Sequence, residues 1–267
     1  MTESRWTRIG LRVASGIVLA FLYLPLIILA VYAFNPSRLQ AWPPSGFTLH
    51  WFAEAVGNAG LRGAIMNSLL AGAGATTVAL VLGTLAALGV HRYSFFGRET
   101  ISFLFVLPIA LPGVVTGIAL RTTFQTVGVD FGLLTIVIGH ATFCVVIAYN
   151  NVIARLRRLP RTPEEASADL GADSWTTFRR ITLPSIRTAL LSGGLLAFAL
   201  SFDEIIVTNF TAGPGTETVP MWILGAIRRP TELPVVNVVA FVLILLSTIP
   251  VYLAQRIGGE ASGGGRY

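Results

Sequence analysis

The stretch of sequence that decides the fold is residues 63–90, GAIMNSLLAGAGATTVALVLGTLAALGV, which contains no charged side chain. A helix needs about 20 apolar residues to cross the hydrocarbon core of a bilayer, and this stretch is longer than that. It is rich in alanine and glycine, and such small residues let helix backbones approach one another closely within lipid. The stretch therefore predicts a transmembrane helix that packs inside a bundle of helices.

Five further apolar stretches of similar length lie on either side of it. Four are uncharged, and the fifth is interrupted only by Asp203 and Glu204; they cover residues 13–34, 100–120, 131–154, 233–255 and 188–210. The first is longer than the roughly 7–15 apolar residues of a signal peptide, so we interpret it as a retained span. The sequence thus predicts an all-α, polytopic membrane protein with about six transmembrane helices.

Composition supports this interpretation and excludes one class of function. The chain is 54% hydrophobic and 12% charged, and its mean hydropathy is +0.72. All of its basic residues other than histidine are arginine, and a standard phosphate-binding loop requires a lysine. ATP hydrolysis would therefore have to occur on another polypeptide. The single cysteine, Cys144, excludes an intrachain disulfide, and we see no catalytic cluster or metal-ligand motif.

The distribution of arginine predicts the topology. If the N-terminus lies in the cytoplasm, fourteen of the nineteen arginines fall in cytoplasmic segments, as the excess of positive charge in cytoplasmic loops requires. Both termini are then cytoplasmic, and the net charge of +6 is explained without a nucleic-acid partner. We divide the chain into a first span with its outer loop (1–62), a helical core (63–257) and a Gly-rich tail (258–267) that we expect to be disordered. Pro108 and Pro112 should kink the third span.

The long inner loop, residues 155–187, contains the most informative motif, TPEEASADLG at 162–171. Thr162 suits an N-cap, Pro163 a first helical position and Glu165 the third position of a capping box, with Gly171 as the terminating residue. A second short helix is expected from Ser174 to the residues before Pro184. From these residues alone, the pair could be a simple connector.

The same loop resembles the EAA loop of permeases in binding-protein-dependent (type I) ABC importers, and the matching residues are Glu165, Ala166, Ser167, Gly171, Ile181, Leu183 and Pro184. The family usually has alanine where this chain has Ser167. The resemblance implies the type I importer permease fold and a loop that docks on a cytoplasmic ATPase subunit. It also implies a second permease subunit as heterodimer partner, two ATPase copies that bind ATP and Mg²⁺, an extracytoplasmic solute-binding protein, and a location in the bacterial inner membrane.

Further segments are similar to the second permease of spermidine/putrescine importers. They are FTLHWF at 47–52, SFDE at 201–204, Phe210, GPG at 213–215 and TVP at 218–220. This resemblance implies a polyamine substrate and no enzymatic activity on this chain. The alternatives are an ABC permease for another small solute or a secondary transporter driven by an ion gradient.

Asp203 and Glu204 are candidates for the substrate pathway. A carboxylate inside the membrane costs about 2.5–3.5 kcal/mol on insertion scales, so it should face water, a partner or a substrate. Acidic groups would attract a cationic polyamine, although Arg228 and Arg229 would repel it unless Glu217 or Glu232 neutralises them. The alternative is that the two acids cap a broken helix or pair with Arg121. His140 could relay protons or simply form hydrogen bonds to a neighbouring helix.

Overall fold

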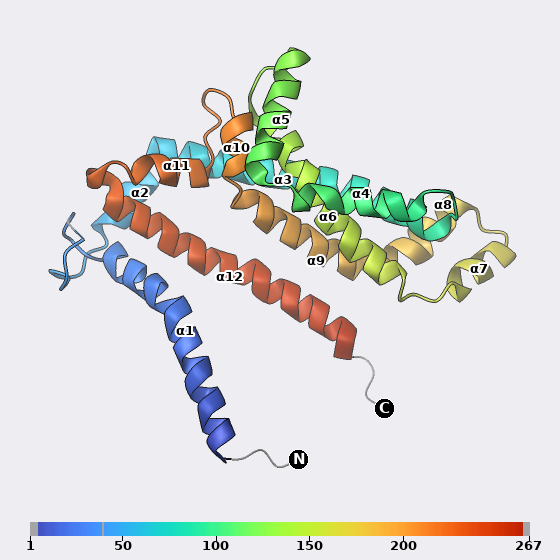
Figure 1. The fold of residues 1–267 in the computed structure, drawn as a ribbon, viewed down its shortest axis with the longest axis horizontal. Helices are drawn as coiled ribbons and strands as arrows, with labels where there is room; N and C mark the ends of the chain where they lie inside the picture. The colour runs from blue at the N-terminus through green and yellow to red at the C-terminus, as the bar shows by residue number, and fades with distance from the viewer. Residues whose placement is uncertain (1–4, 39, 264–267) are drawn as a thin grey trace. The chain divides into compact units, whose positions relative to one another are not determined.

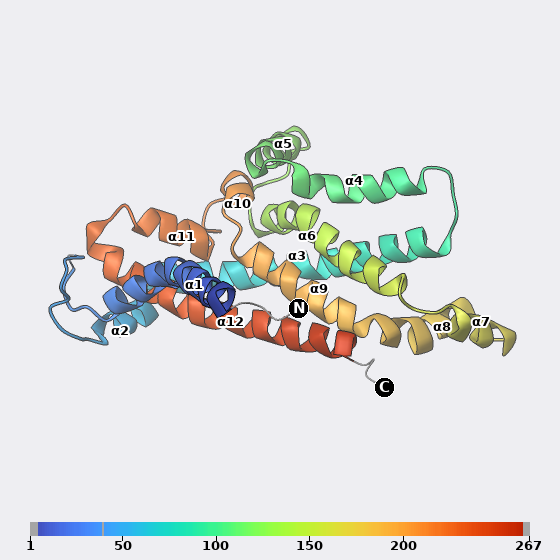
Figure 2. The same cartoon turned by 60° about the horizontal axis from the view of Figure 1, so that its bottom comes forward.

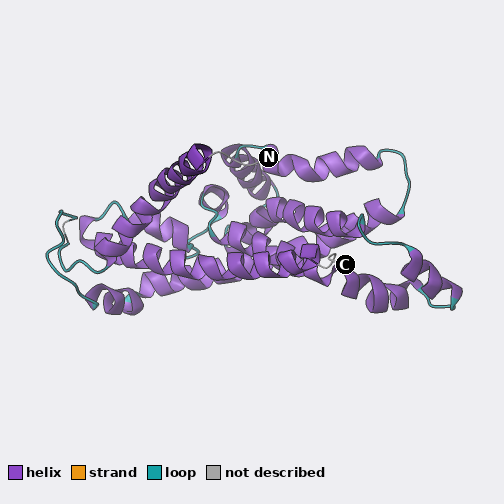
Figure 3. Cartoon of the chain, turned by 90° about the horizontal axis from the view of Figure 1, so that it is seen from below, coloured by secondary structure: helices purple, strands orange, loops and turns teal. Residues whose placement is uncertain are grey.

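The computed structural model describes residues 5–38 and 40–263, and these form helices and loops without a strand (Figure 3). The α-helices are α1 (Arg5–Ala33), α2 (His50–Gly57), α3 (Ala59–Arg92), α4 (Arg98–Ala110), α5 (Gly113–Thr126), α6 (Leu133–Leu156), α7 (Thr162–Asp169), α8 (Ser174–Thr177), α9 (Leu183–Phe202), α10 (Ile206–Thr211), α11 (Val219–Ala226) and α12 (Leu233–Gly263). A π-helical turn, Phe178–Thr182, joins α8 to α9, and a 3₁₀ turn, Pro230–Glu232, precedes α12. The predicted all-α membrane protein is confirmed.

Five helical segments in the described part of the chain are long and apolar enough to cross a membrane: Arg5–Ala33, Ala59–Arg92, Leu133–Leu156, Ser174–Phe202 and Pro230–Thr248. The remaining predicted span, 100–120, is broken into α4 and α5. The break lies at Leu111–Pro112, where both residues adopt extended ψ angles of 138° and 130°. Proline lacks a backbone donor and disfavours a helical residue before it, which explains the break.

The chain divides into two compact units. One contains the chain up to Leu61 together with Ile223–Leu246, and the other contains Arg62–Trp222 and the chain from Ser247. This grouping follows contacts in space, whereas the predicted division at residues 62 and 257 follows the sequence and stays a prediction.

In the first unit, three aromatic rings explain this grouping. Phe34 lies 5.1 Å from Phe52 and 5.5 Å from Phe241, measured between ring centroids. Trp51 is buried, and its indole Nε1 donates a hydrogen bond to the Asn35 carbonyl at 2.8 Å. These contacts join the end of α1, the start of α2 and α12.

The second unit is built around α6 and α9, which lie side by side (Figures 1 and 2). Small residues permit this packing: Ala79, Cys144 and Ala197 meet in one buried cluster. At Gly83 of α3, an added Cβ would lie 2.8 Å from the Tyr149 backbone nitrogen of α6. The small residues of 63–90 thus provide close helix contacts, as the sequence predicted.

The C-terminal helix differs from expectation. α12 continues through Gly263, so residues 258–263 of the tail expected to be disordered are helical, and residues 264–267 lie outside the described residues. A helix that has already formed grows residue by residue without a new nucleation step. The apolar span can therefore continue as a helix into the tail.

Candidate functional site

The motif at 162–171 forms α7, an eight-residue helix that begins one residue earlier than predicted. Arg161 occupies the N-cap position without a side-chain cap, so the predicted capping box of Thr162 and Glu165 is wrong. Pro163 still lies in the first turn, where its missing N–H costs nothing. Glu164 and Glu165 also lie there, and negative charge favours the N-terminal end of the helix dipole.

The C-terminal end of α7 agrees with the prediction. Gly171 has φ +80° and follows the C-cap Leu170. The Gly171 N–H donates to the Ala168 carbonyl at 2.9 Å, and the Ala172 N–H donates to the Ser167 carbonyl at 3.1 Å. These two bonds form a Schellman motif, so Gly171 terminates the helix as expected.

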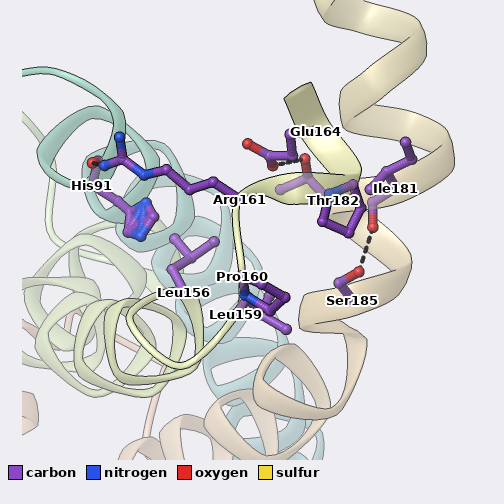
Figure 4. A pocket seen from close by; sticks show the side chains of 10 residues that line it. His91, Leu156, Leu159, Pro160, Arg161, Glu164, Ile181, Thr182 and Ser185 are labelled. Atoms are coloured by element: carbon purple, nitrogen blue, oxygen red, sulfur yellow. Dashed lines mark hydrogen bonds between the residues drawn. The ribbon is translucent and has the colours of Figure 1, made fainter. Parts of the chain in front are cut away.

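A polar cluster, Arg92–Glu164–Thr182, connects α7 to two other elements (Figure 4 shows Glu164 and Thr182). The Arg92 Nη2 group, in the last turn of α3, donates to Glu164 Oε1 at 2.9 Å and to Thr182 Oγ1 at 3.0 Å. The Thr182 hydroxyl also donates to Glu164. Partial burial acts to raise the pKa of Glu164, but the hydrogen bonds from Thr182 and Arg92 and the charge of Arg92 outweigh it and lower that pKa. We call this cluster the α7 lock.

Ser167 provides a second attachment. It is buried, and its hydroxyl lies 2.9 Å from the buried Thr177 hydroxyl of α8. The alanine that the family usually has at this position could not form this bond. Ser167, where this chain differs from the family, therefore forms a hydrogen bond with Thr177.

The predicted second helix begins at Ser174 but does not end before Pro184. Asp173 caps it by accepting a hydrogen bond from the Thr176 N–H at 3.0 Å. The chain then passes through the π-helical turn directly into α9. In that turn the Leu183 N–H donates to the Phe178 carbonyl, and this wider turn accommodates the missing donor of Pro184. The loop therefore contains one separate short helix, α7. The second predicted helix is continuous with α9 and extends it toward its N-terminal end.

The pocket beneath α7 is too small for a solute. Its volume is about 50 Å³, and its lining includes His91, Arg161, Glu164, Ile181 and Ser185 (Figure 4). This volume holds only a few water molecules. The pocket marks where α7 rests on the rest of the unit.

The remaining face of the loop points away from these attachments. Glu165, Ala166 and Leu170 are exposed on α7, with Leu170 89% exposed. Trp175 is 65% exposed and stacks on Phe178 at 5.7 Å between ring centroids. An apolar, acid-bearing surface held by a rigid base is suited to docking on another protein. The other predicted loop residues have mixed positions: Ile181 and Leu183 are partly buried, and Pro184 is exposed.

The two candidate pathway acids have different surroundings. α9 ends at Phe202 and α10 begins at Ile206, so both acids lie at a break in the helix. Asp203 is exposed, whereas Glu204 Oε1 accepts a hydrogen bond from the Val207 N–H of α10 at 2.9 Å. Glu204 therefore caps the second half of the broken helix, and Asp203 is the acid left available to water or a solute.

Arg121 does not pair with either acid in the described part of the chain. Its Nη1 donates to the Phe210 carbonyl at 3.4 Å, and its guanidinium lies 5.1 Å from the centre of the Phe131 ring. Arg121 therefore contacts the end of α10 and does not neutralise the charge of Asp203.

His140 holds the two sides of the break together. It is fully buried in α6, with Nδ1 2.7 Å from the Ser201 hydroxyl and Nε2 2.7 Å from the Thr208 hydroxyl. The Thr208 hydroxyl donates its proton to the Glu204 carbonyl at 2.7 Å. Nε2 must therefore carry the proton that Thr208 accepts, and Nδ1 accepts from Ser201. His140 is bonded to neighbouring helices, as one of the two interpretations of the sequence expected.

The sequence reasoning missed the α7 lock. Glu164 was only part of the quoted motif, and Arg92 was only one of the cytoplasmic arginines. The sequence did contain one indication of it. Glu164 and Glu165 are adjacent on a helix and project about 100° apart, so only one of them can face a docking partner and the other must have a different contact. Thr182 carries no comparable signal in the sequence.

The chain is similar to known transport proteins. Residues 79–258 match the family described as "Binding-protein-dependent transport system inner membrane component". The putrescine transport system permease protein PotI of Escherichia coli K12 is 37% identical over 248 residues, which cover 88% of this chain and 87% of the relative. The spermidine/putrescine permease protein PotC of the same strain is 33% identical, covering 92% and 93%.

A solved structure supports the fold. The bacterial alginate ABC transporter in complex with a periplasmic protein that holds an alginate pentasaccharide has a chain with TM-score 0.68. The match covers 98% of this chain and 96% of that one at 16% identity. The protein is thus a non-catalytic, multi-pass component of the inner membrane with the fold of type I ABC importer permeases. It belongs to the family of binding-protein-dependent transport system inner membrane components.

Proposed function

We propose that this permease imports polyamines such as putrescine and spermidine and forms half of the translocation path, with a second permease subunit as its heterodimer partner. The named relatives PotI and PotC, at 37% and 33% identity, support this substrate class. The exposed carboxylate of Asp203 at the helix break supports it independently, because a cationic amine is attracted to an acid where water is scarce.

The observation that carries the coupling part of the proposal is the contrast between the two faces of α7. One face is fixed by the α7 lock and by the Ser167–Thr177 hydrogen bond. The other exposes Glu165, Ala166 and Leu170. A partner that contacts the exposed face moves a rigid body and not a flexible loop. The partner is a cytoplasmic ATPase, present in two copies, and it binds ATP and Mg²⁺; an extracytoplasmic binding protein delivers the solute.

This assignment places the 155–187 loop and both termini in the cytoplasm. The arginine distribution supports this orientation, since the loop and its flanks contain the densest basic segments. The basic pair Arg228 and Arg229 then lies on the outer side. Arg229 forms an ion pair with Glu232 at 2.7 Å, which removes part of the repulsion toward a cationic solute.

An ABC permease for another small solute is the alternative, because the exposed acid is compatible with any cationic or zwitterionic substrate. Uptake of labelled putrescine and spermidine separates these cases. Cells lacking the gene should regain uptake with the wild-type protein. Glu165→Arg should abolish uptake by disrupting the docking face, and Asp203→Asn should weaken it.

Two controls make the test specific. Asp130→Asn removes an exposed acid away from the helix break and should leave uptake near the wild-type level. Membrane abundance must be equal for all variants. If the wild-type protein restores no polyamine uptake, the polyamine assignment is wrong; if Glu165→Arg transports normally, the docking role of α7 is wrong.

A further inference from the structure

A second cavity lies where the start of α4 approaches the end of α6. Its lining residues are Arg98, Glu99 and Ser102 of α4 and Arg157, the C-cap of α6. It is a shallow hollow, open to the surface, with a volume of about 550 Å³. It belongs neither to the docking face of α7 nor to the helix break at Asp203.

The two arginines line this cavity from separate helices, and the structure holds those helices together. The Phe105 ring of α4 stacks on Tyr149 of α6 at 5.1 Å between centroids. The Tyr149 hydroxyl donates to Ser102 Oγ at 2.9 Å, and the Ser102 hydroxyl donates to the Arg98 carbonyl at 3.1 Å. The backbone of the first turn of α4 is therefore anchored on α6, and Arg98 and Arg157 line the same cavity.

The charge of the cavity is positive and locally unpaired. Within the described residues, neither the Arg98 nor the Arg157 guanidinium forms an ion pair or a hydrogen bond to a protein group. Glu99 is the acid in the lining, so the cavity has a net charge of +1. The N-terminal end of the α4 dipole adds to this positive potential. Arg155 is engaged elsewhere, since its Nε donates to the Ser185 carbonyl at 3.0 Å.

The segment just before α4 indicates where this cavity lies relative to the membrane. Tyr93 is 68% exposed, Phe95 is 41% exposed and Phe96 is fully exposed. Three exposed aromatic side chains within four residues, between two membrane segments, are typical of the boundary between water and lipid. We therefore expect the cavity to open at the membrane surface, at the depth of phospholipid headgroups.

We propose that this cavity binds the phosphate of an anionic phospholipid headgroup, with Arg98 and Arg157 as its ligands and the aromatic segment 93–96 against the adjoining acyl chains. Basic pockets between membrane helices bind such headgroups, and arginine forms bidentate hydrogen bonds with phosphate oxygens. The bound lipid would tie α4 to α6 at the surface that also carries α7. This site is independent of the transported solute.

The test uses the assembled transporter in detergent free of phosphate, titrated with dioleoylphosphatidylglycerol or dioleoylphosphatidylcholine and measured by native mass spectrometry. Arg98→Gln and Arg157→Gln should each weaken retention of phosphatidylglycerol about fivefold, whereas phosphatidylcholine retention stays unchanged. Arg158→Gln is the matched control, because Arg158 is exposed next to Arg157 but does not line the cavity. Glu99→Gln should strengthen retention, which guards against loss through misfolding.

Three outcomes would overturn the proposal. Equal retention by Arg157→Gln and Arg158→Gln would show that the lipid responds only to overall charge. Displacement of phosphatidylglycerol by millimolar inorganic phosphate would identify a site for a soluble anion. Loss of the ATPase subunit from Arg157→Gln with unchanged lipid retention would assign the arginine to a protein contact.

Discussion

Removing the charge of Glu164 should loosen α7 without unfolding the protein. Glu164→Gln keeps the size of the side chain but replaces the charge-assisted hydrogen bond from Arg92 Nη2 at 2.9 Å with a neutral one. The Glu164 and Arg92 side chains are 31% and 30% exposed, so the pair is neither fully on the surface nor buried. A surface ion pair contributes about 0.2–1 kcal/mol, and a buried hydrogen bond to a charged group contributes about 1.5–3 kcal/mol. We therefore expect docking of α7 to weaken by about 1 kcal/mol, or about fivefold in its equilibrium constant.

Hydrogen–deuterium exchange measures this change directly. Peptides covering α7 should exchange about fivefold faster in Glu164→Gln, while peptides from the interior of α6 stay unchanged. Glu165→Gln is the matched control, since Glu165 is the exposed neighbour outside the α7 lock. A double-mutant cycle with Arg92→Gln should be non-additive by at least about 0.5 kcal/mol. Additive effects would refute the lock.

The sign of the pH dependence follows from the lowered pKa of Glu164. The carboxylate contributes to docking above its ordinary pKa of 4.5, and the contribution is lost as the pH falls through the lower pKa of the folded state. Protection of the α7 amides, relative to their intrinsic exchange rate at each pH, should therefore fall in the wild type on acidification below about pH 4.5. In Glu164→Gln this loss of protection should be absent, and an identical pH profile of protection in both proteins would contradict the assignment.

Three further predictions concern local geometry. Gly171→Ala should destabilise the end of α7 by about 1 kcal/mol, because φ is +80° there, and faster exchange of the α7 peptides alone would show it. Asp173→Ala should fray the start of α8, because it removes the cap on the Thr176 N–H. The hydrogen bonds from Thr176 lower the pKa of Asp173, so the wild type should lose this cap as the pH falls through that lowered pKa. Protection of the α8 amides, measured at two pH values, tests both expectations. Gly213→Ala should reduce membrane abundance and melting temperature, because the added Cβ would lie 1.9 Å from the Phe131 carbonyl oxygen; normal thermal stability would contradict this packing.

Features that depend on one stretch of sequence were predictable. The uncharged block 63–90 forms a packed membrane helix, and Pro112, where a kink was predicted, lies at the interruption between α4 and α5, whereas Pro108 lies within α4. Gly171 ended α7 because a positive φ at a helix end needs a residue without a Cβ. In each case, the responsible residues lie within a few positions of the feature.

Features that depend on contacts between distant residues could not be predicted from the sequence. The predicted capping box is absent because α7 begins at Thr162, which leaves Arg161 and not Thr162 at the N-cap position. The second loop helix did not stop before Pro184 because a π-helical turn absorbed the proline, and no local pattern announces such a turn. The capping role of Glu204 was one of the alternatives left open by the sequence, and choosing it required knowing that α9 ends at Phe202 and that α10 follows.

α9 connects the two functional regions of this unit, because each end of the helix is tied to one of them. Thr182, directly before α9, belongs to the α7 lock, and Ser201, in its last turn, donates to His140. Between them the helix is continuous for 20 residues, a length of about 30 Å. In the proposed function, a displacement of α7 would be transmitted along this continuous helix to the break that holds Asp203. His140 of α6 bonds both sides of that break, so the two buried hydrogen bonds persist only if α6, α9 and α10 move together. Breaking them would cost free energy, so we expect these three helices to move as one body, with Asp203 carried on it.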